Sequence, residues 1–179
     1  MTTQPALVLK FGGTSLADVT HIERAADKVA AEAARGYRVA VVVSAMAGVT
    51  NRLIQECRDV SFIHDAREYD AVVASGENVT AGLMSLALQK RGIEARSWQG
   101  WQVPITCNDM HGRARILDID VTEMEKRLAT GEIAVLAGFQ GVTPKNRITT
   151  LERGGSATTA EALAWALEPE RCDSYRNVE

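Results

Sequence analysis

The sequence predicts an α/β fold, a three-layer αβα sandwich built around a mostly parallel sheet. Short apolar runs alternate with stretches whose apolar residues recur at helical spacing, and glycine-rich turns join several of them. Strands that alternate with helices form right-handed crossovers, which place helices on both faces of a parallel sheet. The 179 residues, 46% of them hydrophobic, are enough for one domain with a buried core.

The first strands and the first helix have clear local signals. Residues 6–11 are an apolar run that ends at a Gly-Gly turn, which predicts a buried strand. Asp18 is a suitable N-cap, and helical spacing continues from it to Gly36, a suitable C-cap. Residues 39–43 are a β-branched run that suits a parallel strand covered on both faces.

Two helices are expected next. The first is capped by Thr50 or Asn51 and ends near Arg58. The second, at 70–91, is the longest helical stretch, with a break near Ser75-Gly76.

Strands and helices are also expected to alternate in the second half of the chain. The expected elements are a strand and turn at 95–103, an amphipathic helix at 120–129, a strand at 133–139, a helix at 154–167 and a strand at 171–175. The last apolar pattern runs from Cys172 to Val178 with no closing element after it, so the sheet is expected to be incomplete at the C-terminus. An open strand edge there would be covered by a partner or by further sequence.

The charge, hydropathy and cysteine content of the chain argue against several classes of binding partner. The net charge is −3 and there is no long basic run, which argues against a nucleic-acid or membrane-surface binder. No apolar stretch is expected to reach the length of a membrane span, and residues 1–10 do not resemble a signal peptide. The three cysteines are widely spaced, so neither disulfides nor a metal site is predicted. A cytoplasmic protein with small-molecule ligands is expected.

Polar segments lie where strands feed helices, the place where α/β sheets bind ligands. Lys10 precedes Gly12, Gly13 and Ser15. A cation and hydroxyl groups around a diglycine turn suit phosphate, because backbone N–H groups can approach an anion closely. The turn is not a Walker A loop, so a purely structural turn is the alternative.

Other segments offer groups for an amino acid or an anion. Ser44 and Thr50 carry hydroxyls after the second strand, although a simple connecting loop is the alternative. Arg153 and Ser156 flank a diglycine at a helix start, where a guanidinium and free N–H groups can bind a carboxylate or phosphate. Arg153 as a solvated charge is the alternative. Glu77, at the helix break, either binds an ammonium group or favours the helix N-terminus electrostatically.

In this order and spacing, the segments resemble the aspartate kinases of the amino acid kinase family over nearly the whole chain. The motifs lie at 10–15, 43–46 with 48–50, 74–77, 137–141, and 149–151 with 153–156. The stretch 96–104 also looks like bacterial members. The resemblance implies ATP-dependent phosphorylation of the β-carboxylate of L-aspartate, at the start of lysine, threonine and methionine biosynthesis.

The resemblance also implies a role for each residue. Lys10 would be the catalytic cation on the transferring phosphoryl group, and Gly12, Gly13 and Ser15 would bind phosphate oxygens. The substrate-binding residues would be Ser44, Thr50, Glu77, Arg153 and Ser156. Among them, Glu77 would pair with the substrate ammonium and Arg153 with its α-carboxylate. Mg²⁺ would bridge the phosphates of ATP, with no protein metal site.

The chain departs from the family pattern at several places, among them Glu161 and Trp165 in the last helix, where the pattern is small and apolar. Glu152 stands where members usually have glycine, and Ala157 where they have an aspartate that organises the lysine and the phosphate. Residues 176–179 replace a Thr-Asp-Val-Asp segment. Residues 1–179 are therefore expected to be the amino-terminal, substrate-binding part of an amino acid kinase domain, with most of the nucleotide half and the regulatory ACT domains absent.

Two functions follow as hypotheses. The first is an aspartate kinase whose activity is impaired in this chain. The alternative is a non-catalytic homologue that binds a small anion or amino acid, or associates with another chain. A homo-oligomer, or association through the open sheet edge, is expected in either case.

Overall fold

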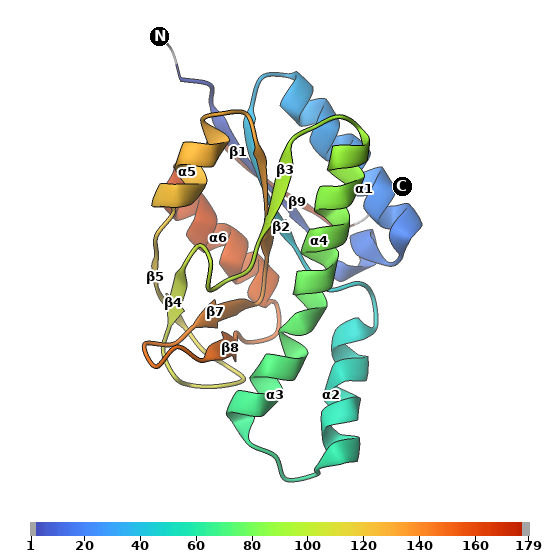
Figure 1. The fold of residues 1–179 in the computed structure, drawn as a ribbon, viewed down its shortest axis with the longest axis vertical. Coiled ribbons are helices and arrows are strands. Elements are labelled where there is room, and N and C mark those ends of the chain that lie inside the picture. The colour runs from blue at the N-terminus through green and yellow to red at the C-terminus, as the bar shows by residue number, and fades with distance from the viewer. Residues whose placement is uncertain (1–2, 177–179) are drawn as a thin grey trace.

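The computed structural model describes residues 3–176 and has three layers (Figure 1). The central sheet has five parallel strands in the order β3-β6-β2-β1-β9. Their bounds are β1 Ala6–Phe11, β2 Arg38–Val43, β3 Ala95–Trp98, β6 Ile133–Ala137 and β9 Arg171–Tyr175. The predicted αβα sandwich with a mostly parallel sheet is confirmed.

Helices cover both faces of this sheet. Helices α1 (Val19–Ala34) and α4 (Ser75–Lys90) pack on one face, and α5 (Thr122–Leu128) and α6 (Gly155–Leu167) pack on the other (Figure 1). Successive residues of β1 supply the two cores: Leu7 and Leu9 belong to the first, and Val8 to the second. This alternation explains why the strand is apolar throughout.

A second, smaller sheet lies beside the first and was not predicted. Its strands run in the order β5-β4-β7-β8, with antiparallel outer pairs and a parallel pair in the middle. The strands are β4 Ile105–Cys107, β5 Ile116–Ile119, β7 Gln140–Val142 and β8 Ile148–Thr150. Because each has only three or four residues, the alternation that marks a strand is too short to recognise in the sequence.

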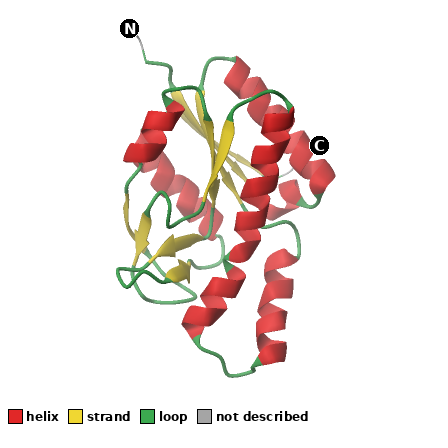
Figure 2. Cartoon of the chain, viewed as in Figure 1, coloured by secondary structure: helices red, strands yellow, loops and turns green. Residues whose placement is uncertain are grey.

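Helices α2 (Val49–Val60) and α3 (Ala66–Val73) form a hairpin that leads into α4 (Figure 2). Two predictions need correction here. Gly48, in a left-handed conformation with φ 79°, occupies the N-cap of α2, so neither Thr50 nor Asn51 caps it. The long helix starts before Asp70, because Asp65 caps α3 by accepting a hydrogen bond from the N–H of Arg67.

Other helix boundaries agree with the sequence signals. Asp18 accepts a hydrogen bond from the N–H of His21 at the start of α1, and Gly36 follows the helix with φ 95°. The break in the long helix falls at Ala74, one residue before the predicted position. A short 3₁₀ helix, Gly13–Leu16, continues the turn after β1.

The stretch Ala66–Lys90 has 25 residues, and its most apolar window of 18 residues has a mean hydropathy of 1.3, so by length and composition it could cross a membrane. The expectation that no apolar stretch approaches the length of a span is therefore wrong for this segment. Buried residues make up 56% of its most apolar window, because α4 packs on the central sheet. A buried core helix is apolar for the same reason as a membrane span, so the segment is weak support for a membrane protein.

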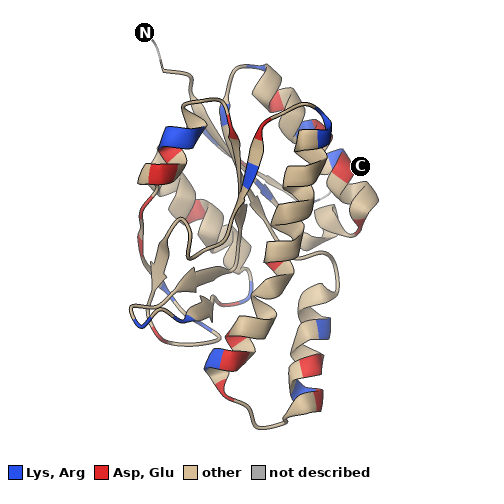
Figure 3. Ribbon diagram, in the orientation of Figure 1, with Lys and Arg blue, Asp and Glu red and all other residues tan. Residues whose placement is uncertain are grey.

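Strand β9 lies at one edge of the central sheet, where it pairs with β1 within the described residues. The predicted apolar pattern continues to Val178, which lies outside those residues. Helices α2 and α5 carry charged residues of both signs, whereas α4 and α6 carry few (Figure 3).

Candidate functional site

A cavity of about 400 Å³ opens where β1, β2 and β6 end. The carboxyl ends of these strands are neighbours in the sheet, because β2 pairs with both β1 and β6. The cavity is lined by the predicted residues Lys10, Gly12, Gly13, Ser44, Thr50, Glu77, Arg153 and Ser156, together with Ala45, Met46, Ala47, Gly48, Asn51, Phe139, Gly154, Gly155 and Ala157. Segments far apart in the sequence thus meet in one place.

Lys10 brings a cation to the turn after β1. A Cβ atom added to Gly12 would lie 3.5 Å from its Nζ, so the ammonium group lies close to the diglycine turn. Burial, with the positive charge of Arg176 as a smaller contribution, lowers the pKa of Lys10 below its usual value. A partly desolvated cation interacts more strongly with an anion than one in open water.

The first turn of α6 forms another wall. Ser44 Oγ donates a hydrogen bond to Ser156 Oγ over 2.9 Å, which joins the end of β2 to the start of α6. No side chain caps α6, whose N-cap Gly154 has φ 83°. Helix starts leave N–H groups without intrahelical acceptors, and the helix dipole favours an anion there.

Gly138 allows β6 and α6 to approach closely. A Cβ atom there would lie 2.9 Å from Ser156 Oγ and 3.0 Å from the carbonyl oxygen of Val43. Phe139, the next residue, has φ 70°, which is uncommon for a residue with a side chain. Leu151 donates its N–H to the Phe139 carbonyl oxygen over 2.9 Å and so ties this strained residue to the segment before Arg153.

Glu77 contributes a buried negative group in the first turn of α4. It is only 3% exposed, and its Oε1 accepts a hydrogen bond of 3.1 Å from the N–H of Ala45. Its Oε2 is buried with no hydrogen-bond partner within the part of the chain that the structure describes. Burial raises the pKa of Glu77 to about 7, although the Ala45 N–H acts in the opposite direction. An unpartnered carboxylate oxygen in a cavity suits a cationic ligand.

Arg153 lies between this cavity and a second one of about 430 Å³, and Thr50, Asn51 and Phe139 also line both. Its side chain is exposed, and it makes no ion pair with any other residue between 3 and 176. The neighbouring Glu152 lines a different cavity, on the side of α6 and β5. The guanidinium therefore remains available to an anion.

Of the predicted residues, Ser15 does not line the cavity. Its side chain is buried, and its hydroxyl donates to the carbonyl oxygen of Tyr175 over 3.2 Å. Sequence reasoning missed Phe139 and the N–H of Ala45, which the cavity includes. Phe139 lies in the motif at 137–141, but its place in the cavity depends on its backbone conformation, whereas the Ala45 N–H could be inferred only from its position after β2.

Comparisons with known proteins agree with this architecture. A model of the amino acid kinase family matches residues 5–179. The chain is 46% identical over 176 residues to an aspartokinase of Rickettsia felis, covering 97% of this chain and 44% of that protein. It is 47% identical over 172 residues to aspartokinase 2 of Bacillus subtilis, covering 96% and 42%. The chain thus spans less than half the length of the curated relatives it matches.

Solved structures give the same result. E. coli aspartokinase III in complex with aspartate and ADP has a TM-score of 0.82 and 29% identity, covering 96% of this chain and 49% of that one. Aspartate kinase from Synechocystis has a TM-score of 0.80 and 38% identity, covering 95% and 28%. Sequence, fold and comparisons lead to one conclusion: the chain belongs to the amino acid kinase family and has a domain of the aspartate kinase type.

Proposed function

We propose that this chain is the amino-terminal, substrate-binding part of an aspartate kinase domain, and that its cavity recognises L-aspartate for ATP-dependent phosphorylation of the β-carboxylate. The observation that carries the proposal is Glu77, whose buried Oε2 has no partner in the described structure and which lines the same cavity as Lys10 and Arg153. An α-amino acid offers an ammonium group for such a carboxylate and a carboxylate for such a guanidinium.

Each charged residue would bind a different group of the substrates. Glu77 would pair with the α-ammonium group, and Arg153 would bind the α-carboxylate through two parallel hydrogen bonds. Lys10 would then face the β-carboxylate and the γ-phosphoryl group. When a carboxylate attacks phosphorus in line, catalysis depends on positioning and on neutralising negative charge, which is the contribution of a fixed cation.

The backbone around the cavity suits the phosphate groups. Gly12 and Gly13 allow close approach after β1, and the uncapped N-terminus of α6 offers N–H groups from the other side. No cluster of three or more His, Cys, Asp or Glu side chains able to hold a metal ion occurs between residues 3 and 176. By the resemblance, Mg²⁺ would be held mainly by the phosphates of ATP, where it would neutralise their charge.

Ala157 favours a second candidate function. It lines the cavity beside Ser156, at the position where the resemblance places an aspartate. A chain without that carboxylate could bind L-aspartate or another small anion without efficient phosphoryl transfer.

We also propose that the chain self-associates through the edge of β9. We further propose a cytoplasmic location, which is consistent with three unpaired cysteines, Cys57, Cys107 and Cys172.

Titration with L-aspartate tests the proposed recognition. Each charge-assisted contact is worth about 1.5 to 3 kcal/mol, so two of them support a roughly millimolar site once the cost of association is included. We expect saturable NMR chemical-shift changes near Glu77 and Arg153, lost in Arg153→Ala and absent with succinate, which lacks the ammonium group. Arg52→Ala, which removes an arginine paired with Glu56 on α2, is the matched control and should bind normally. No shift changes at tens of millimolar L-aspartate would overturn the proposal.

A further inference from the structure

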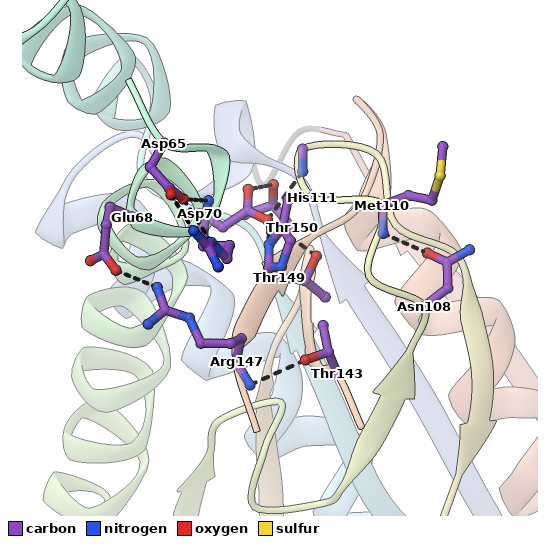
Figure 4. Close-up of polar contacts among 12 residues, drawn as sticks. Asp65, Glu68, Asp70, Asn108, Met110, His111, Thr143, Arg147, Thr149 and Thr150 are labelled. Carbon is purple, nitrogen blue, oxygen red and sulfur yellow. Dashed lines mark hydrogen bonds and ion pairs between the residues drawn. The ribbon is translucent and has the colours of Figure 1, made fainter. Parts of the chain in front are cut away.

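Asp70, on α3, is completely buried and accepts four hydrogen bonds (Figure 4). Its Oδ2 accepts from His111 Nδ1 at 2.7 Å, from the N–H of Gly112 at 3.1 Å and from Thr149 Oγ1 at 3.1 Å. Its Oδ1 accepts from Thr150 Oγ1 at 2.6 Å. A buried carboxylate is costly unless its oxygens are paired, and here both are. None of the functions assigned above uses this group.

The four donors come from two segments, residues 111–112 and 149–150, and a backbone hydrogen bond joins the neighbourhoods of these segments. The N–H of Ala114 donates to the Thr150 carbonyl oxygen over 3.0 Å, and Leu151 donates its N–H to Phe139 over 2.9 Å. Thr150 is the last residue of β8 and lies three residues before Arg153. We call residues 150–153 the arginine loop. Asp70 therefore holds the start of the arginine loop, together with the loop around Gly112, against α3.

The other side of the connection runs along the helix. Helix α3 leads through Ala74 directly into α4, whose first turn carries Glu77. Gln140 fixes this junction, since its Nε2 donates to the Ala74 carbonyl oxygen over 2.8 Å and to Asn78 Oδ1 over 2.9 Å. Asp70 is thus attached to the element that positions Glu77 and is hydrogen-bonded to the loop that positions Arg153.

We propose that Asp70 is a positioning residue that sets the placement of Arg153 relative to Glu77, and so the affinity of the cavity for an α-amino acid head group. The inference rests on the proposed function for its ligand, while the mechanical connection stands on hydrogen bonds alone. Arg153 has no ion pair with another described residue and its side chain is exposed, so its position depends on the backbone that carries it. Without the Asp70 carboxylate, the donors of two segments lose their common acceptor.

Glu68 provides a matched control on the same helix. Its carboxylate pairs with Arg147, which lies just before β8, and makes no hydrogen bond to Thr150 or to residues 111–112 (Figure 4). Glu68→Ala therefore removes an acid and a connection from α3 to the β7–β8 hairpin, but it leaves the Asp70 cluster complete.

Amide hydrogen exchange of the full chain tests the connection without any ligand. In Asp70→Ala we expect the amides of Ala114 and Leu151 to exchange at least tenfold faster, while those of β1 and β2 keep their rates. Glu68→Ala should leave Ala114 and Leu151 unchanged. If Asp70→Ala does not fold, Thr150→Val removes one hydroxyl donor at constant shape, and Thr150→Ser restores it; the first should accelerate exchange at Ala114 and the second should not. Unchanged rates, or equal acceleration in β1 and β2, would overturn the connection.

L-aspartate affinity tests the consequence. We expect Asp70→Ala, or Thr150→Val in its place, to raise the dissociation constant about tenfold, with Glu68→Ala and Thr150→Ser within twofold of the unmodified chain. Faster exchange at Ala114 with unchanged affinity would reduce Asp70 to a structural residue and overturn the positioning role. If the unmodified chain binds no L-aspartate, the proposed function fails, and the positioning of a ligand-binding arginine fails with it, whereas the exchange rates still decide whether Asp70 holds the loop.

Discussion

The backbone N–H of Ala45 donates a 3.1 Å hydrogen bond to Oε1 of Glu77, while Oε2 of the same carboxyl group is buried without a partner in residues 3–176. One donor does not compensate for the loss of water around a carboxylate. The pKa of Glu77 is consequently raised to about 7 by burial. A cation bound at Oε2 would stabilise the ionised form, so ligand binding and the charge of Glu77 are linked.

This linkage predicts that L-aspartate binds more tightly as the pH rises. Below about pH 7 Glu77 is mostly protonated in the free chain, and its proton must leave before the carboxylate can pair with an ammonium group. The dissociation constant should fall about tenfold between pH 6 and pH 8. NMR titrations across this range measure it, with Glu77→Gln expected to bind weakly and without pH dependence. A constant affinity from pH 6 to pH 8 would show that Glu77 does not contact the ligand.

The same group predicts that the free energy of unfolding decreases with pH. The unfolded chain ionises Glu77 near its usual pKa of 4.5, whereas the folded chain keeps the proton until about pH 7. The folded state binds more protons between these values, so stability is lost as the pH rises through this window. The full difference corresponds to about 3 kcal/mol. In urea unfolding, Glu77→Gln should therefore gain stability relative to the unmodified chain at pH 8 but not at pH 4.5. The exposed Glu56→Gln is the control and should change by less than about 1 kcal/mol at either pH.

The contact between β6 and α6 predicts opposite effects for two glycine substitutions. Gly138→Ala should lower the free energy of unfolding by about 1 to 3 kcal/mol, because its Cβ atom would lie 2.9 Å from Ser156 Oγ on α6 and 3.0 Å from the carbonyl oxygen of Val43. Gly82→Ala, in α4, meets no atom within 4 Å and should raise stability by about 0.5 to 1 kcal/mol through helix propensity. Urea unfolding of the two variants measures both values. If both substitutions changed the free energy of unfolding by the same amount, β6 and α6 would have to move apart at Gly138 without cost.

Much of the fold could be predicted because its signals are local. The bounds of β1 and β9 agree with the sequence expectation, since β1 is an apolar run that ends at a Gly-Gly turn and β9 follows Pro169, which stops the preceding helix. The small sheet could not be predicted, because the pairing of β4 with β7 joins residues far apart in the chain. The start of α3 was missed because Asp65 follows an irregular segment that gives no periodic pattern before the cap.

The candidate site also has residues that the sequence could predict and residues that it could not. Lys10, Glu77 and Arg153 could be selected because residues after strands and at helix starts converge in parallel sheets. Ser15 looked similar in sequence, but its hydroxyl is directed to Tyr175 by the pairing of β1 with β9. Asp70 had no signal at all, since its side-chain donors are 41 to 80 residues away.

The edge of β9 predicts self-association. Within the described residues β9 pairs with β1 alone, so its other side is open to another strand. Light scattering should show a concentration-dependent rise in mass in the micromolar range. Because Cys172 on this strand is exposed, the measurement needs reducing conditions, and Cys172→Ser should associate like the unmodified chain. A monomer at all concentrations would contradict the prediction.

Ala157 predicts that this chain forms aspartyl phosphate no faster than background. It lies in the first turn of α6 and lines the cavity that contains Lys10, at the position where the resemblance expects a carboxylate that organises the lysine and the phosphate. Binding groups without that organiser hold substrates but lose the alignment on which phosphoryl transfer depends. Trapping the product as its hydroxamate, with ATP and Mg²⁺, measures turnover. Product that disappears in Lys10→Ala would contradict the prediction. Ala157→Asp locates the cause: a gain of tenfold or more that also requires Lys10 would assign the deficit to position 157, whereas no gain would assign it to nucleotide binding, since the groups proposed to bind L-aspartate are already together in one cavity.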